Sequence, residues 1–392
     1  MIIEELSKKD IIFSNLKEIG KVMQDNADDV DKKGRFPHEA INAMKEFKLM
    51  GAYIPENLGG LGCNMRELVE IGKELGRYCA ASAMIWAMHQ IQLACLVHHG
   101  MHMDSIRDYL KRAAENQHLI ASITSEVGVG GDIGRSIAGV EVTNQIGTLH
   151  KKASVISYGK YADSYLTTAK KSLDASETDQ VLVLFESKDT VAEQTTVWDP
   201  MGMRGTCSPG FNIQATFPTD YILDTPFKDI AVQSMVPVTH ILWASVWSGM
   251  ARDAVSKAQK ATKYKMKQNL KNGIQGTVNS QLVEVDNKLT LMINNLDICT
   301  DKYSGLINEI NTDSRGLYAL DFTLQLNNLK MVSSEMAVEI VQKSMYICGI
   351  VAYLNNTPYS LGRSFRDIMS SVVMIHNDRL YATNSSLLML QK

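Results

Sequence analysis

The feature that most constrains the fold is a change in hydrophobic period near residue 118, which reverses near residue 235. Before the change, apolar residues recur at helical spacing from residue 5 to residue 115, including a long apolar helix predicted at 65–99 with a break near Gly76. After residue 235 the helical period returns, and it predicts helices at 241–267, 279–308, 322–347 and 379–390.

Between these two helical regions the apolar segments are short, rich in β-branched residues and separated by turn residues. They predict strands at 119–124, 137–142, 147–156, 164–169, 180–185 and 211–216. Several strands this short favour a barrel or packed sheets over a parallel α/β sheet. We therefore expect an α+β fold with an N-terminal helical domain at 1–117, a barrel-like β domain at 118–230 and a helical bundle at 231–392.

Composition excludes several classes of function. The net charge is −3 and charged residues make up 21% of the 392 residues, so no basic footprint for nucleic acid is present. No run of about 20 apolar residues predicts a membrane span. The six cysteines lack C-x-x-C spacing, which argues against structural zinc, and a metal site is not expected. The N-terminus lacks the order of a signal peptide, so we expect a cytoplasmic protein with reduced thiols.

A glycine-rich stretch follows the first predicted strand. Ser125 and Glu126 lead into a loop with glycines at 128, 130 and 131, and Asp132 closes it. Glycines let main-chain N–H groups approach a planar or phosphorylated ligand closely. Taken alone, the same pattern is equally typical of an ordinary hairpin loop.

Six motifs in order resemble the acyl-CoA dehydrogenase family over nearly the whole chain. Residues 125–132, Ser-Glu-Val-Gly-Val-Gly-Gly-Asp, are similar to the family's Thr-Glu-Pro-Gly-Ala-Gly-Ser-Asp. Residues 55–62 resemble its Pro-Glu-x-x-Gly-Gly-Leu-Gly loop. Further likenesses lie at 155–163, 202–206, 334–339 and 363–367.

The resemblance implies a C-terminal four-helix bundle and FAD held between the bundle and the β domain. It places the flavin ring against the hydroxyls of Ser122, Thr124, Ser125 and Ser157, and the dinucleotide near Lys265 and Gly349. It also implies a homodimer or homotetramer in which a neighbouring subunit helps to hold the cofactor. The reaction it implies is α,β-dehydrogenation of an acyl-CoA or an acyl carrier protein thioester, with an electron-transfer flavoprotein as electron acceptor.

The sequence departs from the family at the catalytic base. The position that usually carries glutamate is Ile375, and the alternative position on the first bundle helix is Thr239. With Gly131, these two positions are expected to line the substrate. His240, His376 or Asp378 are the candidate replacements, since histidine can accept a proton near neutral pH. The non-catalytic interpretations are that His376 is an exposed loop residue and that Asp378 is the N-cap of a helix.

Two other interpretations of the missing glutamate stay open. In one, the substrate carries a proton that is acidic enough, or differently placed, to need no such base. In the other, the protein is a flavin-dependent monooxygenase of the same fold, which uses reduced flavin and oxygen. The cofactor motifs also differ from the family pattern: glycines are lost around Gly349, and Val155 stands where a tryptophan that covers the ring is usual.

Overall fold

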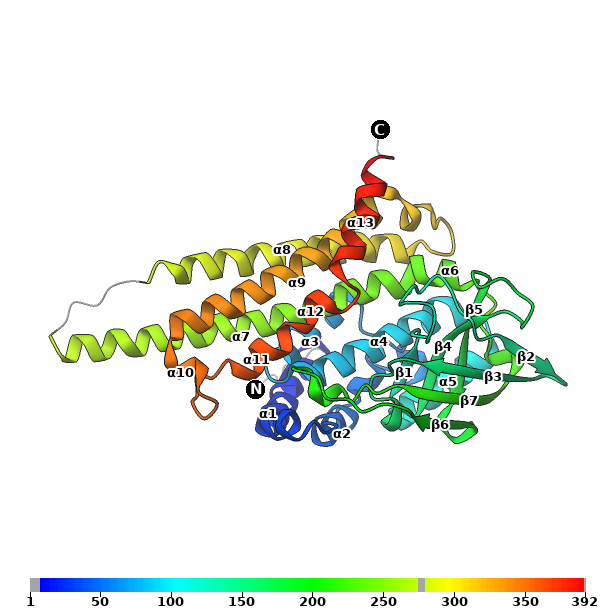
Figure 1. Cartoon of the computed structure of the whole chain (residues 1–392), viewed down its shortest axis with the longest axis horizontal. Coiled ribbons are helices and arrows are strands. Elements are labelled where there is room, and N and C mark those ends of the chain that lie inside the picture. The colour runs from blue at the N-terminus through cyan, green and yellow to red at the C-terminus, as the bar shows by residue number, and fades with distance from the viewer. Residues whose placement is uncertain (1–7, 274–278, 391–392) are drawn as a thin grey trace, which may run out of the picture.

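The computed structural model describes residues 8–273 and 279–390, and it has the expected order of helices, then strands, then helices (Figure 1). The predicted break near Gly76 is present, because one helix ends at Gly76 and the next begins at Ala80. The predicted helical residues 5–7 lie outside the described residues. The N-terminal helices are α1 (Lys8–Lys33), α2 (His38–Glu46), α3 (Met65–Gly76), α4 (Ala80–Gly100) and α5 (Asp104–Asn116).

Local sequence explains where α3 begins. Asn64 accepts a hydrogen bond from the N–H of Glu67 at 3.0 Å, and the Glu67 carboxylate accepts the N–H of Asn64 at 2.9 Å. This reciprocal capping box satisfies two donors that a helix N-terminus leaves unpaired. The next helix, α4, is apolar on all sides and is therefore buried on all sides.

Two helical stretches are long and apolar enough to cross a membrane, Ala80–Gly100 and Phe227–Lys271. In the fold, 89% and 78% of their most apolar windows are buried inside the protein. Burial of this kind is what the core helices of a large domain show.

The middle domain contains two sheets and not a closed barrel. One sheet has the order β1–β4–β5, with β1 parallel to β4, and the other has the antiparallel order β2–β3–β7–β6. The sheets meet where the rings of Phe185 and Phe217 stack at 6.1 Å. The strands are β1 (Ile120–Ile123), β2 (Val140–Thr143), β3 (Ile146–Ala153), β4 (Ser164–Lys170), β5 (Gln180–Glu186), β6 (Thr190–Gln194) and β7 (Phe211–Pro218).

The six predicted strands are confirmed with small shifts at their ends, but β6 was missed. Its sequence, Thr-Val-Ala-Glu-Gln, lies on a sheet edge with four of its five residues exposed. An edge strand with little buried surface shows no hydrophobic alternation, so the period gave no signal for it.

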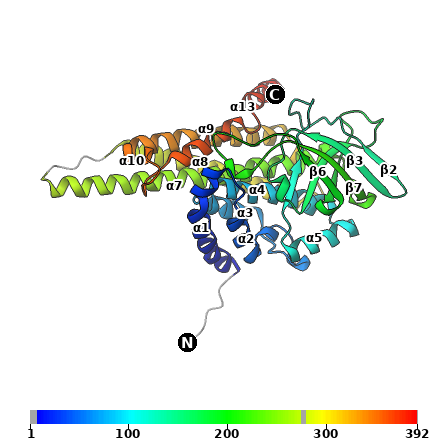
Figure 2. The same cartoon turned by 60° about the horizontal axis from the view of Figure 1, so that its bottom comes forward.

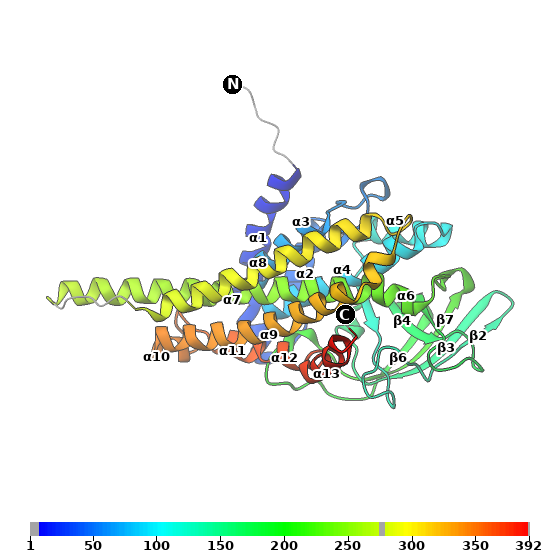
Figure 3. The same cartoon turned by 90° about the horizontal axis from the view of Figure 1, so that it is seen from above.

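The C-terminal region is dominated by three long helices that run side by side, seen clearly from above in Figure 3. They are α7 (Val236–Lys271), α8 (Gln281–Asn308) and α9 (Leu320–Cys348), and the short α6 (Phe227–Ile230) leads into the first of them. The expected fourth helix is broken. After α9 the chain returns along the bundle as α10 (Ile350–Tyr353), α11 (Gly362–Ile368), α12 (Ser370–Val373) and α13 (Asn377–Leu388).

The N-terminal helices pack beneath the bundle, next to the β domain (Figure 2). The closest crossing is between α3 and α7. A Cβ added at Gly76 would lie 2.4 Å from the carbonyl oxygen of Val246, and one added at Gly249 would lie 2.2 Å from that of Lys73. Only glycine lets these two backbones approach so closely, and this crossing connects the first part of the chain to the last.

We predict that Gly76→Ala lowers the free energy of unfolding by about 1–3 kcal/mol, because the added methyl group forces apart a packed helix pair. Urea unfolding followed by far-UV circular dichroism measures it. Gly305→Ala on α8 is the matched control, since a Cβ there meets nothing within 4 Å. That control should be neutral or stabilising by about 0.5–1 kcal/mol, because alanine favours a helix over glycine. Equal effects of the two substitutions would contradict the close crossing.

Candidate functional site

The glycine loop, residues 125–132, is fixed to the β domain by a buried carboxylate. Glu126 accepts hydrogen bonds from the Ser136 hydroxyl at 2.7 Å and from the N–H groups of Ile137 and Ala138 at 3.1 and 2.7 Å. The Lys151 ammonium lies 3.5 Å from the same carboxylate. With its acceptors used in this way, Glu126 is a structural anchor that holds the loop in place.

Ser125 connects the glycine loop to the segment that follows β3. Its hydroxyl donates to the carbonyl of Val155 at 2.5 Å and accepts the N–H of Val155 at 3.1 Å. Two residues further on, the Ser157 hydroxyl accepts a hydrogen bond from Ser208 at 2.9 Å. The two serines predicted to bind flavin therefore lie on adjoining segments, and both are half-buried. Ser122 and Thr124, also half-buried, lie on β1 and just after it.

The segment 374–379 meets the glycine loop from the bundle side. Arg379 donates to the carbonyl of Gly130, and a Cβ added at Gly131 would lie 3.2 Å from the same guanidinium. Ile375 and His376 are exposed beside this contact. The structure thus brings four predicted residues to one place, at the contact of β domain and bundle: Gly131, Ile375, His376 and Asp378.

Asp378 is not the N-cap of the last helix. His376 occupies the N-cap position of α13, and Asp378 lies exposed in the first turn. A carboxylate there is favoured by the positive end of the helix dipole. The predicted cap is wrong by two residues because the helix begins at Asn377, which is buried and hydrogen-bonded to α9.

His240 and Thr239 lie buried on α7 in the interior of the bundle, and His240 faces α9 one turn before Lys330. The Thr239 hydroxyl donates to the carbonyl of Met235 at 2.6 Å, within its own helix. His240 is 1% exposed, and its Nδ1 lies 3.1 Å from the carbonyl of Leu326 on α9. A carbonyl only accepts, so Nδ1 carries the proton. Burial lowers the pKa of His240 to about 4. These contacts make His240 a neutral packing residue between α7 and α9 and do not favour its predicted role as base.

Lys265 and Gly349 come together, but at the opposite end of the bundle from the β domain (Figure 1). The Lys265 ammonium donates to the carbonyls of Ile347 at 3.1 Å and Cys348 at 2.9 Å, at the C-terminus of α9. A cation at this helix end is stabilised by the helix dipole. Along α9, Cys348 lies about 27 Å from Lys330, which contacts the 374–379 segment, at 1.5 Å per residue. The predicted cofactor residues therefore form two separate groups within one chain.

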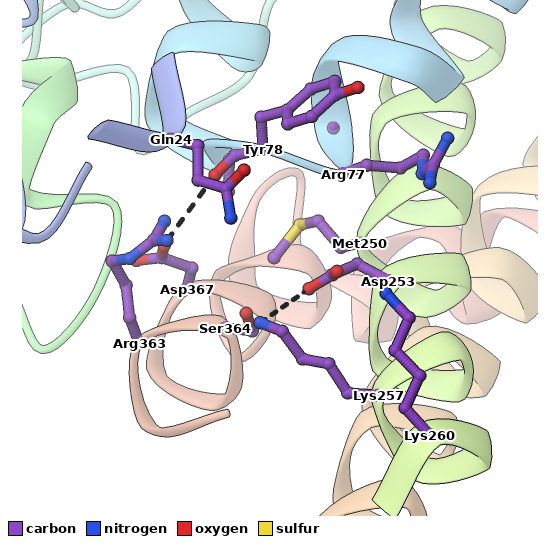
Figure 4. A pocket seen from close by; sticks show the side chains of 12 residues that line it. Gln24, Arg77, Tyr78, Met250, Asp253, Lys257, Lys260, Arg363, Ser364 and Asp367 are labelled. Carbon is purple, nitrogen blue, oxygen red and sulfur yellow. Dashed lines mark hydrogen bonds and ion pairs between the residues drawn. The ribbon is translucent and has the colours of Figure 1, made fainter. Parts of the chain in front are cut away.

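A polar cavity of about 250 Å³ lies where α1, α3, α7 and α11 meet (Figure 4). Two of its cations have carboxylate partners: Lys257 is 2.9 Å from Asp253, and Arg363 is 3.0 Å from Asp28. Burial raises the pKa of Asp367, at the same junction, to about 6. The cavity is thus part of the charged junction between domains and is not part of the contact described above.

Lys330 is the residue at the candidate site that sequence reasoning missed. It is fully buried on α9, and its ammonium donates to the carbonyl of Ile375 at 2.8 Å and to the side chain of Asn377 at 2.6 Å. A sequence signal did exist. Leu326 and Leu329 place residue 330 on the buried face of the helix, where an unpaired lysine is rare.

Comparisons with known proteins agree with this architecture. Residues 17–117 match the family model of the acyl-CoA dehydrogenase N-terminal domain. The chain is 21% identical over 350 residues to a 3-(aryl)acrylate reductase from Clostridium sporogenes, covering 87% of each protein. The fold matches butyryl-CoA dehydrogenase from Megasphaera elsdenii with a TM-score of 0.79 at 17% identity, covering 99% of this chain and 100% of that one.

Residues 17–117 belong to the acyl-CoA dehydrogenase N-terminal domain family, and the relatives and the fold of the whole chain support the same family. A second structural neighbour is FMN-bound TdsC, a dibenzothiophene monooxygenase from Paenibacillus sp. A11-2, with a TM-score of 0.81 at 16% identity over 97% of both chains. The family fold is therefore shared with neighbours whose names describe a dehydrogenase and a monooxygenase. The name of the TdsC structure states that FMN is bound to that protein.

The residues at the contact fit a flavin ring. The indole N–H of Trp243 on α7 is buried without a hydrogen-bond partner among the described residues. Its ring lies 6.1 Å from that of Trp247, which lies beneath Lys330. Buried donors are normally paired, so an orphaned one here fits the acceptor edge of a bound group. Half-buried hydroxyls from β1 and the 155–157 segment add further donors and acceptors.

We predict that acid unfolds the wild type partly through His240. A folded-state pKa near 4 against about 6.5 in the unfolded chain means that its contribution is complete above pH 6.5 and is lost as the pH falls towards 4. His240→Asn keeps a donor for the Leu326 carbonyl and removes the titration. Between pH 7 and pH 5 the variant should lose about 2 kcal/mol less unfolding free energy than the wild type, measured by urea unfolding. An identical pH dependence would show that His240 is not held neutral.

Proposed function

We propose that this protein is an FAD-dependent oxidoreductase that forms a carbon–carbon double bond in an acyl thioester, with CoA or an acyl carrier protein as the carrier. The observation that carries the proposal is the contact of the glycine loop with the 374–379 segment through Arg379 and Gly130. This contact puts the predicted flavin-binding hydroxyls and the predicted base position on two sides of one boundary between domains.

The residues on the two sides of this boundary have different proposed roles. Ser122, Thr124 and Ser157 supply hydroxyls for the ring edge, while the Ser125 hydroxyl holds the glycine loop to Val155. A flavin held by these residues would supply the hydride acceptor for the β-carbon of the substrate. Ile375 occupies the position at which the family carries its catalytic base. We propose that the imidazole of the neighbouring His376 takes the α-proton of the substrate. Asp378, exposed two residues further on, is the second candidate.

The separation of Lys265 and Gly349 from the glycine loop bears on assembly. Since about 27 Å of α9 separates the two groups, one chain does not hold both ends of an FAD with its own predicted residues. We propose that a second copy supplies the Lys265 end, in a homodimer or homotetramer, and that an electron-transfer flavoprotein accepts the electrons.

The proposal predicts a yellow protein with flavin absorbance that is bleached when butyryl-CoA is added without oxygen. Transfer of hydrogen from the substrate to the flavin removes the absorbance band of the oxidised ring, so absorbance spectroscopy monitors the reaction directly. Adding acryloyl-CoA to the protein with reduced flavin tests the reverse reaction, reduction of the double bond. The relative from Clostridium sporogenes is named a 3-(aryl)acrylate reductase, and this name suggests that direction. A flavin-loaded protein that no thioester bleaches or reoxidises would reject the proposal.

We predict that His376→Gln lowers turnover by about 100- to 10,000-fold while the flavin spectrum is kept, because a general base contributes about that much. Steady-state kinetics with an artificial electron acceptor measures it. His102→Gln is the matched control, since His102 is an exposed histidine between α4 and α5 that pairs with Asp224. Full turnover by His376→Gln would show that Asp378 or another group accepts the α-proton.

The second candidate function is a flavin-dependent monooxygenase. Isoleucine at position 375 removes the carboxylate that dehydrogenation uses, and the fold is as similar to TdsC as to butyryl-CoA dehydrogenase. This alternative predicts oxygen consumption that depends on substrate when an external flavin reductase is added. An oxygen electrode separates it from the thioester reaction.

A further inference from the structure

The 374–379 segment is bound by the buried ammonium group of Lys330 on α9. Lys330 is 0% exposed, and its ammonium donates to the Ile375 carbonyl at 2.8 Å and to the Asn377 side chain at 2.6 Å. The indole ring of Trp247 lies 6.0 Å from the ammonium on a neighbouring helix. Hydrogen bonds from a charged donor are shorter and stronger than neutral ones, so these two bonds fix the segment firmly.

Asn377 adds a second connection to the same helix. Its amide donates to the Ser334 hydroxyl and to the Glu335 carboxylate, each at 3.1 Å. Tyr381, one turn further along α13, donates to the same carboxylate at 2.8 Å. The start of α13 is therefore attached to α9 at residues 330, 334 and 335. Lys330 and Ser334 are fully buried, and Lys330 is the cation among the three.

The backbone at Ile375 needs such support. Its φ is +45°, in the left-handed region that β-branched residues rarely adopt. A strained backbone of this kind persists where its surroundings hold it, and strained residues cluster at functional sites. The bond from Lys330 to the Ile375 carbonyl holds this residue directly. Burial lowers the pKa of Lys330 to about 8, so the ammonium remains charged at pH 7.

We infer that Lys330 is a positioning residue for the reaction: it holds Ile375 in the left-handed conformation and so fixes the neighbouring His376 at the start of α13, three residues before the Arg379 that contacts the glycine loop. The inference rests on the proposed function, because His376 has a catalytic role only there. Lys330 itself acts through the segment and does not touch the reacting atoms.

The test compares Lys330→Met with the wild type in two measurements. Amide hydrogen exchange of residues 374–379 reports the anchoring without substrate, and we expect it to rise about 10-fold or more, since local opening is cheaper without the anchor. Steady-state kinetics of the flavin-loaded enzyme should show kcat reduced about 100-fold with KM changed by less than about 3-fold, because a small misplacement of a catalytic group costs about that much.

Two further variants keep the test decisive. Lys257→Met removes a lysine on the same bundle that also donates to a main-chain carbonyl, that of Ser360 at 3.1 Å, and it should change neither measurement. Asn377→Ala keeps the bond from Lys330 to Ile375, so it should shift both measurements in the same direction by a smaller amount. It replaces Lys330→Met if that variant does not fold.

The outcomes separate the two proposals. Unchanged exchange at 374–379 in Lys330→Met overturns the inference, and so does faster exchange with full kcat. A reduced kcat with an equal effect in Lys257→Met also overturns it, because the effect would then be general destabilisation. A wild-type protein that carries flavin but turns over no thioester would reject the proposed function, and the exchange measurement would still decide whether Lys330 holds the segment.

Discussion

The architecture depends on a charged junction where the beginning, middle and end of the chain meet. Arg366 on α11 pairs with both oxygens of Asp31 on α1, and it donates to the carbonyl of Met201 at 2.9 Å. Arg204, from the segment between β6 and β7, donates to the carbonyl of Asp31 at 2.9 Å. A bidentate arginine–carboxylate pair fixes direction as well as distance, so this junction sets the orientation of the β domain relative to the bundle.

Close packing at the junction adds to the ion pairs. The N–H of Met203 donates to the buried Asp367 at 2.6 Å, and a Cβ on Gly202 would lie 2.2 Å from the carbonyl oxygen of Arg366. The Gly-Met-Arg-Gly run therefore serves as an interdomain contact, where its glycines allow close approach and its arginine carries charge. The boundary between the glycine loop and the 374–379 segment has a defined geometry only because this junction holds both sides.

At that boundary Ile375 has a backbone conformation that is rare for its residue type, and the buried Lys330 supports it. Ile375 is an apolar, β-branched residue at a strained position where the family carries a carboxylate, and a buried lysine supports its carbonyl. The left-handed backbone of Ile375 and its support by Lys330 indicate that contacts with α9 hold the shape of this segment. The chemistry then depends on neighbouring side chains, of which His376 is the nearest in sequence.

The sequence by itself determined the order of helices and strands, and it predicted a flavin role for Ser125 and Ser157, which lie on adjoining segments. Both follow from local signals: hydrophobic period defines the elements, and the motifs around Ser125 and Ser157 lie on adjoining loops because short strands end there. The tertiary structure alone decided the rest. His240 lies in a helix that is buried on all sides, so its sequence gives no direction in which the ring points, and only packing against Leu326 shows it to be interior. The separation of Lys265 from the glycine loop, the broken fourth helix and the Lys330 anchor depend on contacts between residues far apart in the chain, which no local pattern records.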